Sequence, residues 1–148
     1  MKRILPPNTY TGARESLYLA GGITLWRDQI IKKLSQLPII IYDPVVENYT
    51  PATHVKWERA HMLKATAVLF WFPQEAVCPI SLYELGAVAA TNKPLIVGTH
   101  PFYKYKEDVK IQLAYARPDV YVVHMFEDLV KQIKERFNGT NTRRNSGR

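Results

Sequence analysis

A single glutamate stands out as a residue suited to covalent chemistry. Glu84 lies early in a helix predicted for residues 81–90, among apolar neighbours such as Leu82 and Leu85. A carboxylate near a helix N-terminus is stabilised in its ionised form, and an ionised carboxylate can attack a sugar carbon. Position alone would also fit an acid that only interacts with the helix dipole. The apolar surroundings favour a carboxylate that faces a cleft, so we expect Glu84 to be a nucleophile.

Further candidate residues fall in the loops that follow predicted strands. These are Gly21, Gly22, Trp26, Asp43, Phe72, Pro73 and His100. Asp43 precedes Pro44 and fits an Asx turn better than a ligand for a substrate hydroxyl group, although both interpretations remain open. His100 could contact a phosphate or carry a proton near neutral pH, but a lone histidine is more often structural.

Two pairs of residues share a predicted helix face. Asp108 and Gln112 are four apart, so they could present an acceptor and an amide to a ligand or a neighbouring subunit, or form a solvated pair. His54 and His61 are seven apart on another helix, without partners that complete a metal site. We therefore predict no metal and no cofactor.

The elements that position these residues follow from the hydrophobic pattern. Short apolar runs predict strands at residues 17–20, 39–42, 66–71, 94–97 and 120–123, and helical spacing predicts helices at 25–37, 54–64, 81–90, 107–115 and 126–137. This alternation predicts an α/β fold: a flavodoxin-like three-layer sandwich with a five-stranded parallel sheet, order 2-1-3-4-5, and helices on both faces. Ligands of such sheets bind at the carboxyl ends of the strands, where the strand order reverses.

The size and composition fit one domain. The chain has 148 residues, of which 47% are hydrophobic. We divide it into an N-terminal extension (1–15), a catalytic domain (16–137) and a disordered tail (138–148), because Asn138-Gly139 is expected to end the last helix. No apolar run reaches the ~20 residues that span a membrane, and Cys78 is the single cysteine. These features predict a cytoplasmic protein without disulfides.

The net charge of +7 does not by itself indicate a nucleic-acid partner. Three of these charges come from Arg143, Arg144 and Arg148 in the tail. Basic residues near the strand-end loops could attract an anionic substrate, although a solvated basic surface explains them better: Arg14, Arg27, Lys104 and Lys106. Nucleic-acid binding is therefore not expected.

Six motifs, in order and on matching elements, resemble the nucleoside 2-deoxyribosyltransferase family. The resemblance extends over roughly residues 16 to 125, and its order and spacing make it specific. The motifs are YLAGG at 18–22, WE at 57–58, VLFWFP at 68–73, SLYELG at 81–86, KPLIVGTHP at 93–101 and DVKIQ at 108–112.

The resemblance implies roles for particular residues. It makes Glu84 the nucleophile of the ELG motif, Tyr18 the tyrosine that orients it, and Glu58 the acid that contacts the base. Cys78 stands at or near the position of a further base-binding aspartate in the best-known transferases. The resemblance also implies a nucleoside or nucleotide substrate and a homo-oligomer, a dimer or larger, whose subunits share active sites.

The expected reaction is a double displacement at the N-glycosidic bond, with retention of configuration. The enzyme is a transferase if a second base accepts the sugar and a hydrolase if water does. In a related branch that hydrolyses deoxynucleoside monophosphates, small residues and backbone amides before the glutamate hold the phosphate, and Ser81 could serve here. Trp26 and Phe72 could stack on a nucleobase, but such residues are more often core. The alternative is an inactive nucleotide-binding or sensing module, in line with Cys78 in place of an acid.

Overall fold

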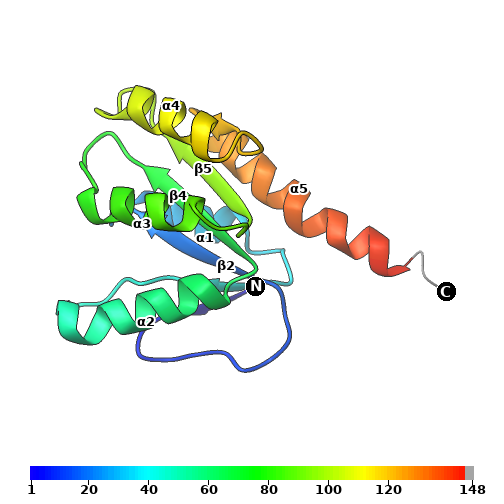
Figure 1. The fold of residues 1–148 in the computed structure, drawn as a ribbon. Helices are drawn as coiled ribbons and strands as arrows, with labels where there is room; N and C mark the ends of the chain where they lie inside the picture. Colours follow the sequence, from blue (N-terminus) through cyan, green and yellow to red (C-terminus); the bar gives the residue numbers. More distant parts are fainter. Residues whose placement is uncertain (146–148) are drawn as a thin grey trace.

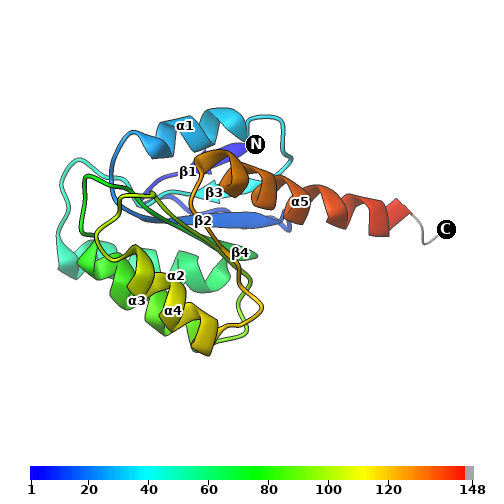
Figure 2. The ribbon, with the colours of Figure 1, turned by 90° about the horizontal axis from the view of Figure 1, so that it is seen from above.

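The computed structural model describes residues 1–145 and shows one parallel sheet between two layers of helices (Figure 1). The strands are β1 (Lys2–Ile4), β2 (Ser16–Gly21), β3 (Ile40–Tyr42), β4 (Ala67–Phe72), β5 (Leu95–Thr99) and β6 (Val122–Val123). They lie in the order β1-β3-β2-β4-β5-β6. The helices are α1 (Trp26–Lys33), α2 (Pro51–Lys64), α3 (Pro79–Ala89), α4 (Lys106–Ala116) and α5 (Phe126–Asn145). Figure 2 shows α1 and α5 on one face of the sheet and α2, α3 and α4 on the other.

The two faces of the central strands build two separate cores. In β2, Leu17 and Leu19 pack toward α1 and α5, whereas Tyr18 and Ala20 pack toward α2 and α3. Successive side chains of a strand point to opposite faces, so a strand that is apolar throughout is covered on both sides. Strand β4 is likewise buried along its whole length. This explains why its sequence lacks polar alternation.

The predicted three-layer α/β architecture is confirmed, and the five predicted strands lie in the predicted order. The count of five was wrong, because the N-terminal extension adds β1 at the edge of the sheet, parallel to β3. The rest of the extension is tied to α2: the Trp57 indole donates to the Asn8 carbonyl at 2.8 Å, and His61 Nε2 lies 2.9 Å from Thr9 Oγ1. A three-residue strand with one buried apolar residue, Ile4, gives almost no periodic signal.

The predicted end of the last helix was also wrong. Helix α5 continues past Asn138 and Gly139 to Asn145. The predicted disorder of residues 138–148 stays a prediction. One glycine costs a helix only about 1 kcal/mol, which does not have to end it. Residues 146–148 of the predicted tail lie outside the described part of the chain. No helix among the described residues is long and apolar enough to cross a membrane.

The end of β2 requires glycine. Gly21 has φ of +116°, a region that side chains rarely adopt, and a Cβ atom there would lie 1.9 Å from the carbonyl oxygen of Trp71 on β4. The backbone of β4 therefore leaves no room for a side chain where the chain leaves β2 for α1. By contrast, a Cβ atom on Gly86 of α3 would meet nothing within 4 Å.

We predict that Gly21→Ala lowers the free energy of unfolding by about 2 kcal/mol or more, because it adds both a steric overlap and an unfavourable φ. Urea denaturation monitored by circular dichroism measures this. Gly86→Ala is the matched control and should stabilise the protein by roughly 0.5–1 kcal/mol, because alanine favours a helix. Equal stabilities for the two variants would contradict the assigned constraint.

Candidate active site

A pocket of about 350 Å³ opens at the carboxyl ends of the strands, beside the reversal of strand order between β2 and β4. This is where α/β sheets bind ligands. Its wall combines the end of β2, the turn into α1, the loop after β3, α2, and the start of α3. The lining residues are Tyr18, Ala20, Gly21, Gly22, Ile23, Arg27, Pro44, Tyr49, Glu58, Ala76, Cys78, Pro79, Ile80, Ser81 and Glu84.

Three elements bring the predicted catalytic side chains to this pocket. Tyr18 comes from β2 and is 1% exposed, Glu58 comes from α2, and Glu84 comes from α3. Both carboxylates are partly buried. Helix α3 begins at Pro79, whose missing N–H costs nothing at a first helical position, after Cys78 in a left-handed conformation (φ 57°). The sequence predicted that these three residues share one site, and the structure brings them together in this pocket. Their catalytic roles stay predictions.

The protonation of Glu84 differs from the expectation. Burial, and secondly the charge of Glu58, raise its pKa to about 7, while Arg27 and Arg59 act in the opposite direction. The helix N-terminus was expected to keep Glu84 ionised at neutral pH. Glu84 is the sixth residue of α3, beyond the first turn where the dipole acts, so desolvation dominates.

The other two groups are also shifted toward their neutral forms. Burial raises the pKa of Glu58, with His54 and Arg27 opposing it. Burial, followed by the charge of Glu84, raises the pKa of Tyr18 well above its usual value. The Tyr18 hydroxyl group therefore keeps its proton at physiological pH and can donate a hydrogen bond. The pocket thus pairs two acids of raised pKa with a phenol donor, the arrangement from which acid-base chemistry is built.

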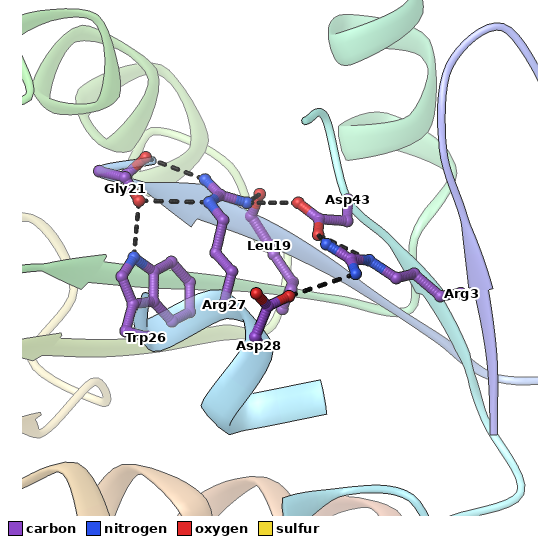
Figure 3. A network of polar contacts seen from close by, with 8 residues as sticks. Arg3, Leu19, Gly21, Trp26, Arg27, Asp28 and Asp43 are labelled. Carbon is purple, nitrogen blue, oxygen red and sulfur yellow. Dashed lines mark hydrogen bonds and ion pairs between the residues drawn. The ribbon is translucent and has the colours of Figure 1, made fainter. Parts of the chain in front are cut away.

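The turn after β2 is fixed by side chains of α1 (Figure 3). The Trp26 indole donates to the Gly22 carbonyl at 2.6 Å, and Arg27 donates to the same oxygen at 3.2 Å and to the Gly21 oxygen at 2.9 Å. Trp26 is 4% exposed and does not line the pocket. Its predicted role in substrate binding is therefore replaced by a role in holding the glycine turn.

Asp43 was predicted as a residue of an Asx turn or a ligand for a substrate hydroxyl group, and the structure gives it another role. It is fully buried, and its carboxylate accepts hydrogen bonds from Arg27 at 2.7 Å and from Arg3. Both carboxylate oxygens are thus engaged by arginines, and Asp43 does not line the pocket. Phe72 is fully buried in the core, and Pro73 packs behind Gly22. Gly21, Gly22 and Ser81 do line the pocket, as predicted.

Three predicted residues lie away from this pocket. His100 accepts a hydrogen bond at Nδ1 from the Phe102 backbone N–H, 3.1 Å away, within its own loop. Asp108 and Gln112 line a separate hollow between α3 and α4. They share one helix face, as expected, but they do not line the pocket at the carboxyl ends of β2 and β4. Within the described residues, no group of three or more histidine, cysteine, aspartate or glutamate side chains is arranged to hold a metal.

Several pocket residues were not identified as site residues from the sequence. Tyr49 is 48% exposed and stacks on His54, with ring centroids 5.2 Å apart and 22° between the planes. Ile23 and Ile80 are exposed by 65% and 64% although both are apolar. Exposed aromatic and branched side chains at the edge of a pocket are typical of ligand contact. A tyrosine in an irregular loop carries no periodic signal, so no sequence pattern pointed to Tyr49.

A second groove adjoins the pocket, because Glu58 and Glu84 line both. It runs between α2 and α3 and is largely apolar. Its wall includes Leu63 and Tyr83, which are exposed by 64% and 73%. The two carboxylates therefore lie between the pocket at the strand ends and this apolar groove.

Fold and site together define a three-layer α/β protein with paired carboxylates at the carboxyl edge of its sheet. The family model described as nucleoside 2-deoxyribosyltransferase like matches residues 14–103, more than half of the chain, and the protein belongs to this family. The matched segment contains Tyr18, Glu58 and Glu84 but ends before Asp108. No curated protein shows a significant match to the chain.

We predict that Glu84→Gln stabilises the protein at pH 8 but not at pH 4. A carboxyl whose pKa is raised to about 7 contributes stability below its unfolded value of 4.5, and that contribution is lost as pH rises through 7. The expected gain at pH 8 is about 1–2 kcal/mol, allowing for partial exposure. Urea denaturation at both pH values measures it, with Glu135→Gln on the exposed face of α5 as control. An identical stability change at pH 4 and pH 8 would be inconsistent with this shift.

Proposed function

We propose that the protein breaks the N-glycosidic bond of a nucleoside, with Glu84 as nucleophile, and passes the sugar either to another base or to water. The observation that carries this proposal is the meeting of Glu84, Glu58 and Tyr18 in one pocket at the strand ends. Family membership supports a nucleoside substrate and glycosyl transfer as the type of reaction. Cleavage of a glycosidic bond with retention of configuration uses a nucleophilic carboxylate on one side of the anomeric carbon and a proton donor toward the leaving group.

The proposed first step is attack by the Glu84 carboxylate on the anomeric carbon. The bond from that carbon to the base nitrogen breaks, a sugar–Glu84 ester forms, and the base takes up a proton. Glu58, which lines the same pocket, is the proposed source of that proton in the molecules in which Glu58 holds the proton and Glu84 is ionised. Tyr18 donates a hydrogen bond that orients the nucleophile. In the second step a free base or water attacks the same carbon and gives up a proton to Glu58, the ester bond to Glu84 breaks, and configuration is retained.

The edge of the pocket supplies a surface for the base. Tyr49 presents a half-exposed ring, and Ile23 and Ile80 add exposed apolar surface near it. A nucleobase stacks well on such groups, because its faces are flat and apolar. We place the base against Tyr49 and the sugar deeper, over Tyr18 and Glu84.

The charges of the pocket favour a sugar without a 5′-phosphate. Arg27 is the one cationic side chain among the described residues that line it, and Arg27 is already paired with Asp43. At the start of α3, Pro79 has no N–H and the Leu82 N–H already donates to the Cys78 carbonyl. A phosphate dianion would therefore face two carboxylates, which outnumber the one net positive charge of Arg3, Arg27 and Asp43. Its remaining hydrogen-bond donors would be the Ser81 hydroxyl group and the backbone N–H groups of Ile80 and Ser81 at the start of α3.

The apolar groove between α2 and α3 supports the proposal of a homo-oligomer. Its exposed Leu63 and Tyr83 lie next to the two carboxylates, so a second copy of the chain placed there would cover the pocket. Sedimentation equilibrium of the wild type tests this arrangement. A strictly monomeric enzyme with full activity would exclude it.

We predict that Glu84→Ala lowers the rate of sugar transfer by a factor of roughly 10³ or more, because the covalent route is lost. Product formation from deoxynucleosides, with and without a free acceptor base, is followed by chromatography. Mass spectrometry of the intact wild type should show a sugar adduct that Glu84→Ala lacks, and Glu135→Ala serves as control. Undiminished turnover by Glu84→Ala would refute the assignment. Binding without product across a broad nucleoside panel would instead favour an inactive binding module.

We also predict that kcat/KM for a deoxynucleoside exceeds that for its 5′-monophosphate by about tenfold or more, corresponding to roughly 1.4 kcal/mol of unfavourable charge interaction. Steady-state kinetics with matched pairs of both substrates measure the ratio. Raising the ionic strength should bring this ratio closer to one, because salt screens the repulsion between the phosphate and the carboxylates. A preference for the monophosphate would mean that the amides at the start of α3 bind phosphate after all.

A further inference from the structure

One arginine joins the end of β2 to the wall of the pocket. Arg27 is 3% exposed and donates hydrogen bonds to the backbone oxygens of Leu19 at 3.2 Å, Gly21 at 2.9 Å and Gly22 at 3.2 Å (Figure 3). Buried carbonyl groups need donors, and the guanidinium supplies several in a fixed planar arrangement. Arg27 therefore holds the glycine turn beneath the proposed substrate position, together with the Trp26 indole, which also donates to the Gly22 oxygen.

The same guanidinium belongs to a buried cluster of charges. Arg27 lies 2.7 Å from one oxygen of Asp43, and Arg3 from β1 pairs with the other oxygen. Figure 3 shows the two arginines approaching Asp43 from opposite sides. Two positive charges and one negative charge leave a surplus of positive charge. Arg3 also approaches Asp28, but that pair is mostly exposed and contributes little.

Arg27 and Glu84 line the same pocket, so the charge of this cluster lies beside the proposed nucleophile. The charged and titratable groups around Glu84 are Tyr18 on β2, Arg27 on α1, Tyr49 in the loop before α2, and Glu58 and Arg59 on α2. Burial and Glu58 oppose ionisation of Glu84, whereas Arg27 and Arg59 favour it. Arg59 is exposed, so water screens its charge, but Arg27 is buried and fixed by its hydrogen bonds.

We propose that Arg27 is a positioning residue, which holds the glycine turn under the sugar and supplies the fixed positive charge that keeps Glu84 available as a carboxylate. The negative charge of Asp43 offsets part of the field of Arg27 at Glu84, and its hydrogen bond fixes the orientation of the guanidinium. The role of this cluster in catalysis rests on the proposed function of Glu84. Its electrostatic action on Glu84 does not, and can be measured without substrate.

The experiment compares two substitutions with opposite expected signs. In protein labelled with ¹³C at glutamate carboxyl groups, the Glu84 signal is assigned with Glu84→Gln and titrated by NMR. Arg27→Gln removes a positive charge, so Glu84 should titrate higher than in the wild type by about half a pH unit or more. Asp43→Asn removes a negative charge at almost unchanged shape, so Glu84 should titrate lower. Lys134→Gln, an exposed change on α5 with the same loss of charge, should leave the titration unchanged.

Arg27→Lys separates the charge of the side chain from its shape. It should keep the Glu84 titration close to that of the wild type but lower kcat about tenfold, because one ammonium cannot reproduce the planar set of hydrogen bonds. A purely structural role would change stability in Arg27→Gln and Asp43→Asn without shifting Glu84 in opposite directions. Shifts of the same sign, or none, would overturn the proposal.

If Arg27→Gln does not fold, Asp43→Asn and Arg3→Gln decide the question. The Arg3 side chain is 30% exposed, so its loss is tolerated more easily. Arg3→Gln removes a positive charge and should raise the Glu84 titration slightly, while Asp43→Asn lowers it. Should the wild type fail to process any nucleoside while these shifts appear, the proposed function falls and the electrostatic role of the cluster stands. Normal turnover without the shifts would overturn the electrostatic role and leave the proposed function standing.

Discussion

The removal of Glu84 from water is the constraint on which the rest of the site depends. A carboxyl group placed between apolar helices and a second acid resists ionisation, yet the proposed role of Glu84 as nucleophile requires its ionised form. The fold counters this cost with Arg27, which is itself buried and therefore needs its own partners. Asp43 and the carbonyl groups at the end of β2 are those partners. At the end of β2, Gly21 packs closely against β4, and the charged cluster of Arg3, Arg27 and Asp43 is buried beside it.

The arrangement of the sheet explains why these groups meet. Strand β2 lies between β3 and β4. The chain therefore runs from β2 to β3 on one side of β2 and then crosses back to β4 on the other side. The turn after β2 therefore borders the loop after β3 on one side and α3 on the other. Residues that are far apart in sequence, such as Tyr18 and Glu84, reach the same pocket without any long connection.

Much of this could be predicted from the sequence, and the remainder has identifiable physical reasons. Strand β4 was predictable because both of its faces are covered, which gives a continuous apolar run. The location of Glu84 in a pocket was predictable because an acid among apolar residues is unusual on a solvated helix face. The short strand β1 has one buried apolar residue and no periodicity, so it carries no recognisable signal. The role of Asp43 depends on Arg3, 40 residues away, and no local pattern reports such a pair. The protonation of Glu84 depends on burial, which position in a helix does not reveal.

Strand β1 also protects the sheet. Without it, β3 would expose a row of unpaired backbone groups beside three buried apolar side chains, which invites pairing with another chain. With it, the outermost strand of the sheet is short and carries Lys2 and Arg3. Short, charged edge strands oppose pairing with a strand of another molecule. Residues Lys2–Ile4 are therefore expected to reduce aggregation through this edge of the sheet.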